Sequence, residues 1–307
     1  MRIGIRLPPC RPVDEVAEAA RRAEELGFDD VWVPDSQTLW RDAYATLACA
    51  ALRTERVRLG TAVTNVVTRH PSVVAAAART IAELAPGRFV LGVGVGNSSV
   101  EPVGLRSSTT AELRAGVTGL RDTLPGIPIH VAASGPRNLA LGGELGDGVI
   151  LLAGASAARV EEALTIVGRH GTSPEVTVSA FCHVTDDLER DAPALKPVCA
   201  AMAQKGGGAA LAAAGIEVRV PRQVPEVRPD LLHAENWEHA VEVCSAWVSD
   251  ADAVRFAEEF CLYSSVERIA DRMAGLKRLG VTGVLLQHVG SYTLPHEVME
   301  SLGKVLA

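Results

Sequence analysis

The sequence predicts an α/β fold, a (β/α)8 TIM barrel with an insertion before the last strand. Eight short apolar runs alternate with longer amphipathic segments along the 307 residues. The runs are largely apolar and do not alternate strictly with polar residues, as in FVLGV (89–93) and GVILL (148–152). This pattern is expected of strands that are buried on both faces in a parallel sheet covered by helices. Eight such units favour a closed barrel, and their number alone also allows an open doubly wound sheet.

Each element of the barrel corresponds to a stretch of sequence. Strands are expected at Arg2–Leu7, Asp29–Pro34, Val57–Val63, Phe89–Val93, Ile129–Ala132, Gly148–Leu152, Val176–Val184 and Gly283–His288. Helices are expected at Val13–Leu26, Ala43–Leu52, Ser72–Leu84, Ala111–Thr123, Arg137–Leu145, Ala157–Gly168, Leu188–Ala203, Val266–Leu279 and Glu297–Leu306. Three helix-to-strand junctions share one pattern, in which a leucine ends the helix and a glycine provides a left-handed cap: Leu26-Gly27, Leu145-Gly146 and Leu279-Gly280.

One segment, from about residue 205 to residue 261, interrupts the alternation. It contains three consecutive glycines and a proline-rich stretch, followed by expected helices at Trp237–Val248 and Asp252–Phe260. We expect it to form a lid over the mouth of a single barrel domain that spans residues 1–307. Its rings are typical of a small core, and a lid that offers them to a planar ligand is the alternative: His233, Trp237, His239 and Trp247.

The composition narrows the class of partner. The formal net charge is -7 and no cluster of lysine and arginine stands out, so we expect no nucleic acid. No apolar run is long enough to cross a membrane and no signal peptide is visible, which indicates a cytoplasmic protein with a small-molecule partner. The six cysteines form no CxxC pair, so we expect reduced core residues and no metal site.

The stretch RFVLGVGVGNSS, residues 88–99, combines a buried strand with a glycine-rich loop. Glycines let a ligand approach the backbone, and Gly94, Gly96, Asn97 and Ser98 offer short neutral donors that suit a phosphate. The alternative is that the glycines only make room for packing. The loop matches neither the dinucleotide fingerprint nor the Walker motif, since the first lysine of the chain is Lys196.

A second candidate phosphate site follows the next strand. After Ala133, the residues Ser134, Gly135, Pro136 and Arg137 begin a helix, which would present free N–H groups beside a cation. Such residues are also what a helix start requires for structural reasons alone. Two sites of this kind on adjacent strands indicate a phosphorylated cofactor that lies across the barrel mouth.

The other residues expected at the carboxyl ends of the strands are polar but include few acids, bases or nucleophiles. They are Asp35, Ser36, Thr64, Asn65, Gln287 and His288. Such a site suits chemistry that a cofactor performs while the protein supplies position and a dry pocket. It suits a hydrolase badly, since no nucleophile elbow or metal-ligand cluster is visible.

Four motifs in order resemble one family. They are DDVWVPD (29–35), LGTAVTNVVTRHP (59–71), GRFVLGVGVGNSS (87–99) and VAASGPR (131–137). Together they resemble the bacterial luciferase-like superfamily, and within it the coenzyme F420-dependent branch that includes methylenetetrahydromethanopterin reductase. The resemblance covers nearly the whole chain and is weakest in the insertion.

The resemblance implies a barrel that binds a deazaflavin or flavin at its carboxyl-end mouth, in a protein that forms a homodimer. A non-proline cis peptide is implied within Gly60–Thr64, where Thr64 and Asn65 would help to back the ring. The residues implied to receive the phosphate-bearing tail or the ring edge are Gly94, Gly96, Asn97, Ser98, Ala133, Ser134, Gly135, Pro136 and Arg137.

One departure from the family concerns proton transfer. Many members have histidine after the acid that ends the second strand, whereas this chain has Asp35-Ser36. A serine hydroxyl is no base near neutral pH. Asp35 and Ser36 remain the candidate catalytic pair, with a group from the insertion, His70 or His288 as alternatives, or a substrate that needs no proton transfer.

The leading function is an oxidoreductase that transfers hydride between F420 and a small organic substrate. The alternatives are an FMN-dependent two-component monooxygenase with a partner flavin reductase, a non-catalytic flavin-binding protein, and a barrel isomerase or lyase that binds a substrate phosphate. Nothing in the residues separates F420 from FMN directly, and the likeness to the reductase branch favours F420.

Overall fold

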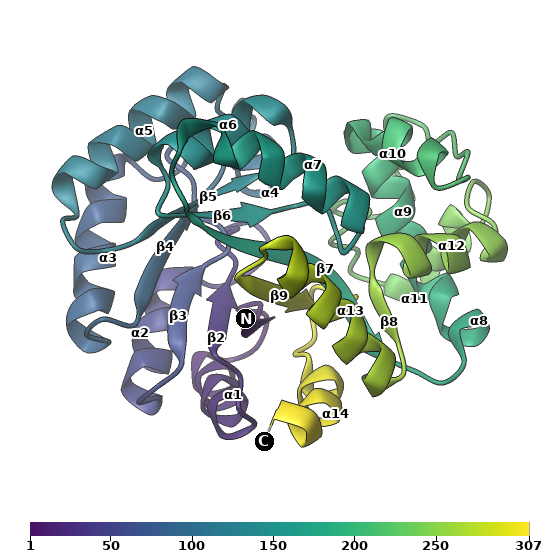
Figure 1. Ribbon diagram of the computed structural model, residues 1–307, viewed down its shortest axis with the longest axis horizontal. Helices are drawn as coiled ribbons and strands as arrows, with labels where there is room; N and C mark the ends of the chain where they lie inside the picture. Colours follow the sequence, from purple (N-terminus) through teal and green to yellow (C-terminus); the bar gives the residue numbers. More distant parts are fainter. Residues whose placement is uncertain (307) are drawn as a thin grey trace.

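The computed structural model describes residues 1–306 and contains a closed barrel of parallel strands (Figure 1). The barrel strands are β1 (Arg2–Arg6), β2 (Asp30–Val33), β3 (Arg58–Thr61), β4 (Phe89–Val93), β5 (Ile129–Ala133), β6 (Gly148–Leu151), β7 (Glu175–Val184) and β9 (Gly283–Gln287). Each strand pairs with the next in this order, and β9 pairs with β1, which closes the barrel. The predicted TIM barrel and its eight predicted strands are confirmed.

A ring of helices covers the outside of the barrel. The ring consists of α1 (Val13–Glu25), α2 (Ala43–Arg53), α3 (Pro71–Leu84), α5 (Thr110–Thr123), α6 (Pro136–Leu145), α7 (Ala157–Val167), α13 (Val266–Leu279) and α14 (His296–Leu306). Neighbours in this order contact one another, and α14 contacts α1. Apolar residues of strands and helices form one continuous core between the two layers.

The predicted glycine caps hold at two of the three junctions. Gly27 and Gly280 have φ of 87° and 108°, in the left-handed region. Gly146 has φ of -81°, so the expectation of a left-handed cap there was wrong. A glycine is needed at this position for a different reason, because a Cβ atom would lie 2.6 Å from the carbonyl oxygen of Gly148.

Two elements differ from the prediction. The single helix expected at Leu188–Ala203 is broken into α8 (Leu188–Asp191), a 3-10 turn and α9 (Lys196–Met202). The cause is Pro193 and Pro197, which lack the N–H that a helix interior needs and therefore stand at the starts of the turn and of α9. The short strand β8 (Leu262–Ser264), which pairs with the carboxyl-terminal part of β7, was missed.

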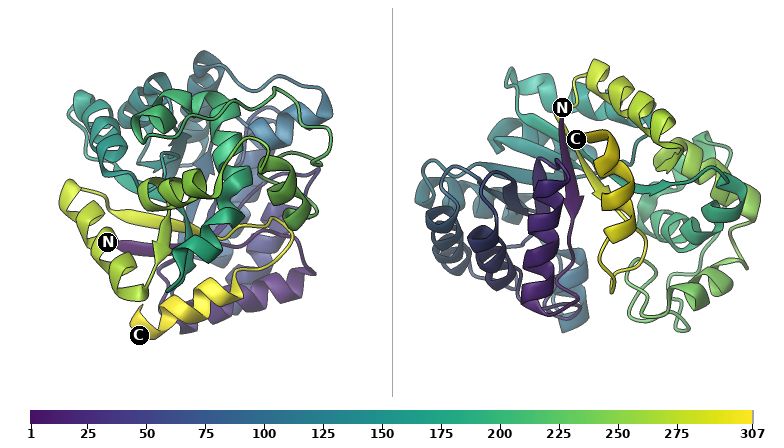
Figure 2. Two further views of the ribbon diagram at one scale, coloured as in Figure 1. Left: turned by 90° about the vertical axis from the view of Figure 1, so that its right-hand side faces the viewer. Right: turned by 90° about the horizontal axis from the view of Figure 1, so that it is seen from below.

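The insertion between β7 and α13 has a hydrophobic core of its own. It also contains α10 (Gly208–Ala213), α11 (Trp237–Cys244) and α12 (Asp250–Phe260), and Figures 1 and 2 show these helices gathered on one side of the barrel. Buried residues of this core run from Ala192 to Tyr263, so it begins before the expected boundary near residue 205. Phe181 of β7 and Val289 after β9 pack against it, which places the insertion beside the carboxyl ends of those strands.

The interior of the barrel is layered. At the amino ends of the strands, Asp30 is buried and accepts hydrogen bonds from Arg2 and Arg58. Above this charged layer lies an apolar one, formed by Trp32, Val90, Ala132, Ile150 and Leu285. Polar side chains return in the layer closest to the mouth, and they are described below.

Candidate active site

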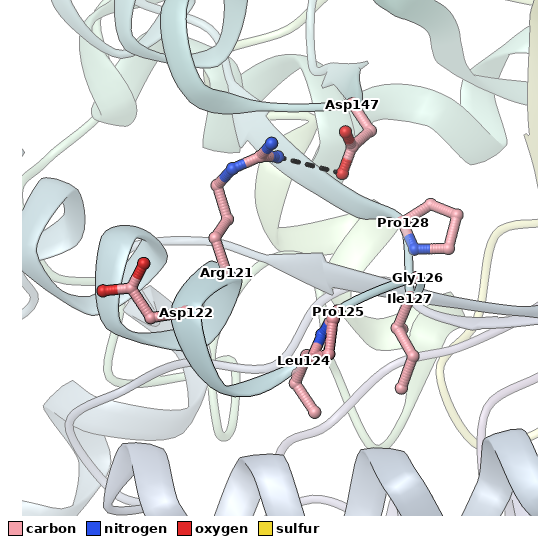
Figure 3. A pocket seen from close by; sticks show the side chains of 8 residues that line it. All are labelled: Arg121, Asp122, Leu124, Pro125, Gly126, Ile127, Pro128 and Asp147. Carbon is pink, nitrogen blue, oxygen red and sulfur yellow. Dashed lines mark hydrogen bonds and ion pairs between the residues drawn. The ribbon is translucent and has the colours of Figure 1, made fainter.

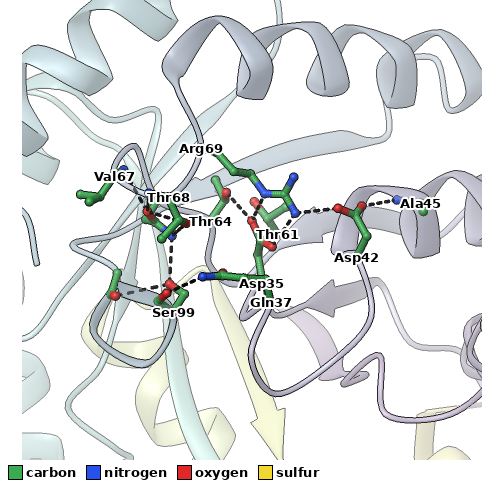
Figure 4. A network of polar contacts seen from close by, with 12 residues as sticks. Asp35, Gln37, Asp42, Ala45, Thr61, Thr64, Val67, Thr68, Arg69 and Ser99 are labelled. Atoms are coloured by element: carbon green, nitrogen blue, oxygen red, sulfur yellow. Dashed lines mark hydrogen bonds and ion pairs between the residues drawn. The ribbon is translucent and has the colours of Figure 1, made fainter. Parts of the chain in front are cut away.

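An acid at the end of β2 is held by two residues that follow β3 (Figure 4). Asp35 accepts hydrogen bonds from Arg69 Nε at 2.9 Å and from Arg69 Nη2 at 3.0 Å. Thr64 Oγ1 donates a third hydrogen bond to Asp35 at 2.7 Å. Because Asp35 is only 4% exposed, these donors offset the cost of burying its charge. Its carboxylate is therefore occupied within the protein.

Arg69 extends the same network toward α2. Its Nη2 atom donates to Asp42 Oδ2 at 2.7 Å, and its guanidinium lies 5.1 Å from the centre of the Tyr44 ring. Burial acts to raise the pKa of Asp42, but hydrogen bonds from the Ala45 N–H and from Arg69 outweigh it and leave that pKa below its ordinary value. Asp42 stays ionised and fixes Arg69, which in turn fixes Asp35.

The loop after β2 is also tied to the glycine-rich loop after β4. The hydroxyls of Ser36 and Ser98 lie 3.0 Å apart, and Gln37 Nε2 donates to the carbonyl oxygen of Ser99 at 2.6 Å. Ser36 is 4% exposed. The two loops are therefore joined by side chains, and Ser36 serves as one of the links.

Asn65 organises the loop after β3 from within. Its Oδ1 atom accepts the N–H groups of Val67 and Thr68, and its Nδ2 atom donates to Ser99 Oγ at 2.9 Å. The main chain of Thr64 pairs with Gly92 and Gly94. Both Thr64 and Asn65 are 0% exposed, so their polar groups serve the loop itself.

Each glycine of the loop after β4 allows a close approach between parts of the protein. A Cβ atom on Gly94 would lie 2.7 Å from Val63 Cγ2, and one on Gly96, where φ is 88°, would lie 2.8 Å from Asn65 Cβ. The packing alternative therefore accounts for these two glycines. Asn97 and Ser98 follow in the short helix α4 (Asn97–Val100), where Asn97 is exposed and Ser98 is half-buried.

The expected non-proline cis peptide is present between Ala62 and Val63, inside the predicted range of residues 60–64. It directly follows β3, and the side chain of Val63 lies against Gly94 of the neighbouring loop. The loops after β3 and β4 are thus in contact at the mouth of the barrel, where the apolar Val63 is half-buried and Gly94 is buried. The cis peptide that the resemblance implies is confirmed.

Most of the segment after β5 is exposed to solvent. Ala133 is buried, whereas Ser134, Gly135, Pro136 and Arg137 are exposed at the start of α6. A Cβ atom on Gly135 would meet nothing within 4 Å. In the part of the chain that the structure describes, Arg137 makes no ion pair. A helix start with a free cation beside it is a place where an anionic group can bind.

Several polar residues at the mouth were missed by the sequence reasoning or given no role. Arg6 ends β1, and Gln287 and Ser179 project from β9 and β7 into the same layer. Trp40 follows the loop after β2, and its Nε1 atom donates to the carbonyl oxygen of Ser291. The signal that could have found Arg6 was an arginine at an inward-facing position of the strand RIGIR.

The two histidines that are alternatives for proton transfer, His70 and His288, differ in their hydrogen-bond partners. Nδ1 of His70 accepts the N–H of Ser72 and caps α3, which is a structural role. His288 Nε2 lies 2.9 Å from the carbonyl oxygen of Thr293, and its Nδ1 atom is buried without a partner. Burial and the nearby Arg6 charge lower the pKa of His288 to about 4, so its ring is neutral at pH 7.

Two shallow hollows lie away from this site. One is at the opposite end of the barrel, between the end of α5 and the start of β5, where Arg121 and Asp147 form a 3.1 Å ion pair (Figure 3). The other lies where Glu259 and Arg272 of α12 and α13 face α7. Neither hollow is lined by a predicted site residue.

Other kinds of site find no support in the described residues. No group of three or more His, Cys, Asp or Glu residues is placed there to hold a metal ion. The six cysteines are free, and burial raises the pKa of Cys182 and Cys199 to about 12. None of the described helices is both long enough and apolar enough to cross a membrane.

The chain is similar to several known proteins. The family model for luciferase-like monooxygenases matches residues 1–124 and 107–283. A 5,10-methylenetetrahydromethanopterin reductase of Archaeoglobus fulgidus is 25% identical over 93% of this chain and 92% of that protein. An F420-dependent glucose-6-phosphate dehydrogenase of Nakamurella multipartita is 34% identical over 51% of this chain and 57% of that one. The match spans only about half the length of several such relatives.

A solved structure agrees with the fold. The coenzyme F420-dependent tetrahydromethanopterin reductase of Methanopyrus kandleri superposes with a TM-score of 0.77. The superposition covers 99% of this chain and 97% of the other, at 20% sequence identity. The likeness therefore extends through the insertion as well as the barrel.

Proposed function

Because the chain belongs to the luciferase-like monooxygenase family, we propose that it is an oxidoreductase that transfers hydride between F420 and a small organic substrate. The relatives that match over much of the chain, or at the highest identities, are named as reductases and dehydrogenases, and several are named as F420-dependent. The observation on this chain that carries the proposal is the exposed Arg137 at the start of α6, for which the described residues show no ion pair. It follows β5, the neighbour of β4, whose loop brings Gly94 against Val63.

The residues present fit a cofactor with an apolar ring system and an anionic tail. Arg137, with Ser134 and Gly135, would hold a phosphate of the tail at the positive end of α6. The surface at Val63 and Gly94 would back the ring. When bound, F420 supplies the hydride donor or acceptor.

The protein's own residues position the reactants. Asp35, Ser36, Thr64 and Asn65 act through the loops that they hold together, because their side-chain polar atoms already have partners. Ala133, Gly96, Asn97 and Ser98 shape the adjoining wall of the site. The role of Asp35 and Ser36 in this proposal is positioning, and neither transfers a proton.

The residue that contacts a substrate hydroxyl in this proposal is His288. Its Nε2–H donates to the carbonyl oxygen of Thr293, which leaves a lone pair on the buried Nδ1 atom, for which the described residues offer no partner. Since the ring is neutral at pH 7, that atom can accept a hydrogen bond from a substrate hydroxyl and orient it.

The proposal includes a homodimer. The packed helices α2 and α3 expose Leu52 (72%), Val73 (52%) and Leu84 (36%) on the outside of the barrel. Burying such side chains between two copies is favourable. Light scattering of the wild type and of Leu52→Glu tests it, since the charged variant should shift the mass toward the monomer.

Turnover tests the proposed function. Purified protein is mixed with F420 and with glucose 6-phosphate or a secondary alcohol, or with reduced F420 and a methylene-substituted pterin, and the deazaflavin absorbance is followed. The expected result is a change that needs both protein and substrate. Turnover with FMN, a flavin reductase and oxygen, and none with F420, would overturn the proposal in favour of a monooxygenase.

A further inference from the structure

Arg6, in the layer nearest the barrel mouth, is a cation with no counter-ion among the residues that the structure describes. Its neighbours Ile5 and Leu7 belong to the core outside the barrel, so the alternation of the strand points Arg6 inward. Nη1 of Arg6 donates to Gln287 Oε1 at 2.7 Å, and the guanidinium lies 5.4 Å from the centre of the Trp40 ring. Its Nε and Nη2 atoms are buried, and no described residue forms a hydrogen bond with them.

In two other arginines of the chain, the same Nε and Nη2 atoms bind a carboxylate. Nε and Nη2 of Arg69 bind the two oxygens of the Asp35 carboxylate, and the same two atoms of Arg22 bind the two oxygens of the Glu300 carboxylate. This side of a guanidinium is a fork that matches an oxyanion. In Arg6 the same fork is empty, and in the described residues no carboxylate lies within ion-pair distance of it.

A buried cation without a partner costs stability, so its presence calls for a ligand that is absent from the protein itself. Burial lowers the pKa of Arg6 to about 10, which still leaves it charged at pH 7. Arg6 as a whole residue is half-buried, so the layer is not sealed from the mouth. Gln287, which in turn donates to Ser179, is neutral and contacts only Nη1 of Arg6.

The position separates Arg6 from the proposed cofactor tail. Around the barrel, β1 and β9 lie opposite β4 and β5, whose loops carry Gly96 and Arg137. The insertion reaches the side of Arg6: Trp40 lies edge-on to His233, with ring centres 5.6 Å apart, and Ser291 Oγ donates to the carbonyl oxygen of Leu232. A group bound at Arg6 would therefore lie between the barrel and the insertion.

We propose that the Nε and Nη2 atoms of Arg6 anchor an oxyanion, a carboxylate or a phosphate group, on the substrate of this enzyme. The inference rests on the proposed function only where it identifies the bound molecule as a substrate. The anion site itself follows from the residues of this chain alone. The neutral His288, one residue after Gln287, offers an acceptor close to this layer, so the substrate class is an organic acid or phosphate ester that also carries a hydroxyl or an equivalent donor.

Binding of two anions without a reaction tests the site. Benzoate and phenyl phosphate are titrated against the wild type, Arg6→Gln, Arg6→Lys and the control Arg137→Gln, with thermal unfolding and tryptophan fluorescence as readouts, because Trp40 adjoins Arg6. At least one anion should raise the midpoint of the wild type and of Arg137→Gln. Arg6→Gln should lose affinity by ten-fold or more, and Arg6→Lys by less.

The two anions distinguish the class of substrate, since a carboxylate site prefers benzoate and a phosphate site prefers phenyl phosphate. Without anion, Arg6→Gln should unfold at the same temperature as the wild type or at a higher one, because it removes an unpaired buried charge. A clear drop in that midpoint, or unchanged anion affinity in Arg6→Gln, would overturn the inference. So would the absence of anion binding to the wild type.

F420 titration of the same variants separates this inference from the proposed function. Arg6→Gln should bind F420 as the wild type does, whereas Arg137→Gln should bind it more weakly. Loss of F420 binding in Arg6→Gln would assign Arg6 to the cofactor and overturn the inference. If no protein binds F420 and the anion affinity still depends on Arg6, the proposed function fails and the anion site stands.

Discussion

Arg69 binds both carboxylate oxygens of Asp35, at 2.9 and 3.0 Å, beneath the loops that form the barrel mouth. The acid that ends β2 is thus part of the framework, because Thr64 provides its third hydrogen bond and little of its surface is exposed. A residue that the sequence offers as a candidate for proton transfer is better suited to holding the loops after β2 and β3 in one arrangement.

Removing Arg69 should destabilise the protein. Arg69→Ala leaves the carboxylate of Asp35 buried and unpaired, which costs about 3–5 kcal/mol of unfolding free energy. Urea unfolding measures this, and Arg79→Ala on the exposed face of α3 should change the value by less than about 0.5 kcal/mol. Adding Asp35→Asn to Arg69→Ala should recover part of the loss; no recovery would show that the pair is not coupled.

The glycines at the mouth should not tolerate alanine. Gly96→Ala places a Cβ atom 2.8 Å from Asn65 at a φ of 88°, and should cost roughly 1–3 kcal/mol. Gly119→Ala in α5, where a Cβ atom meets nothing within 4 Å, should instead stabilise by about 0.5–1 kcal/mol. Equal effects in thermal unfolding of the two variants would contradict the tight packing described for the loop.

Stability should fall in mild acid because of His130 in the barrel interior. Burial, and then the charge of Arg58, lower the pKa of His130 to about 4 from its ordinary 6.5. The unfolded chain therefore binds the proton first, so stability is full above pH 6.5 and is lost as the pH falls toward 4. The loss is on the order of 3 kcal/mol.

The control for this prediction is a variant without the titrating ring. His130→Gln should reduce the dependence of the unfolding free energy on pH between 6.5 and 4 without abolishing it, because His288 has a similarly lowered pKa, and the variant should be less stable throughout. A pH dependence that survives unchanged in His130→Gln would assign it to other groups, of which His288 is the first to examine.

Substituting His288 should slow hydride transfer. His288→Gln removes the acceptor nitrogen that orients the substrate and should lower kcat roughly 10²-fold with F420 affinity unchanged. His70→Gln, at the start of α3, should leave kcat intact and reduce stability by about 1 kcal/mol. Equal kcat values for the wild type and His288→Gln in single-turnover experiments would remove His288 from the proposed mechanism.

The barrel could be predicted because the continuously apolar strands and the glycine junctions are local signals. The sequence signal for the broken helix after β7 was also local, because it consists of Pro193 and Pro197. For the site, only the loops that form it could be predicted, and not the pairings between their side chains. That Arg69 neutralises Asp35, or that the fork of Arg6 is left empty, depends on pairings across the barrel that strand and helix periodicity does not encode.

The measurement that tests the central claim most directly is a parallel titration of the wild type and Arg137→Gln with F420 and with FMN, followed by fluorescence. Tight binding of F420, weaker binding of FMN and a loss of F420 affinity in Arg137→Gln are the predicted results. Preference for FMN, or F420 binding that is indifferent to Arg137, would contradict the assignment of the cofactor or of its anchor at the start of α6.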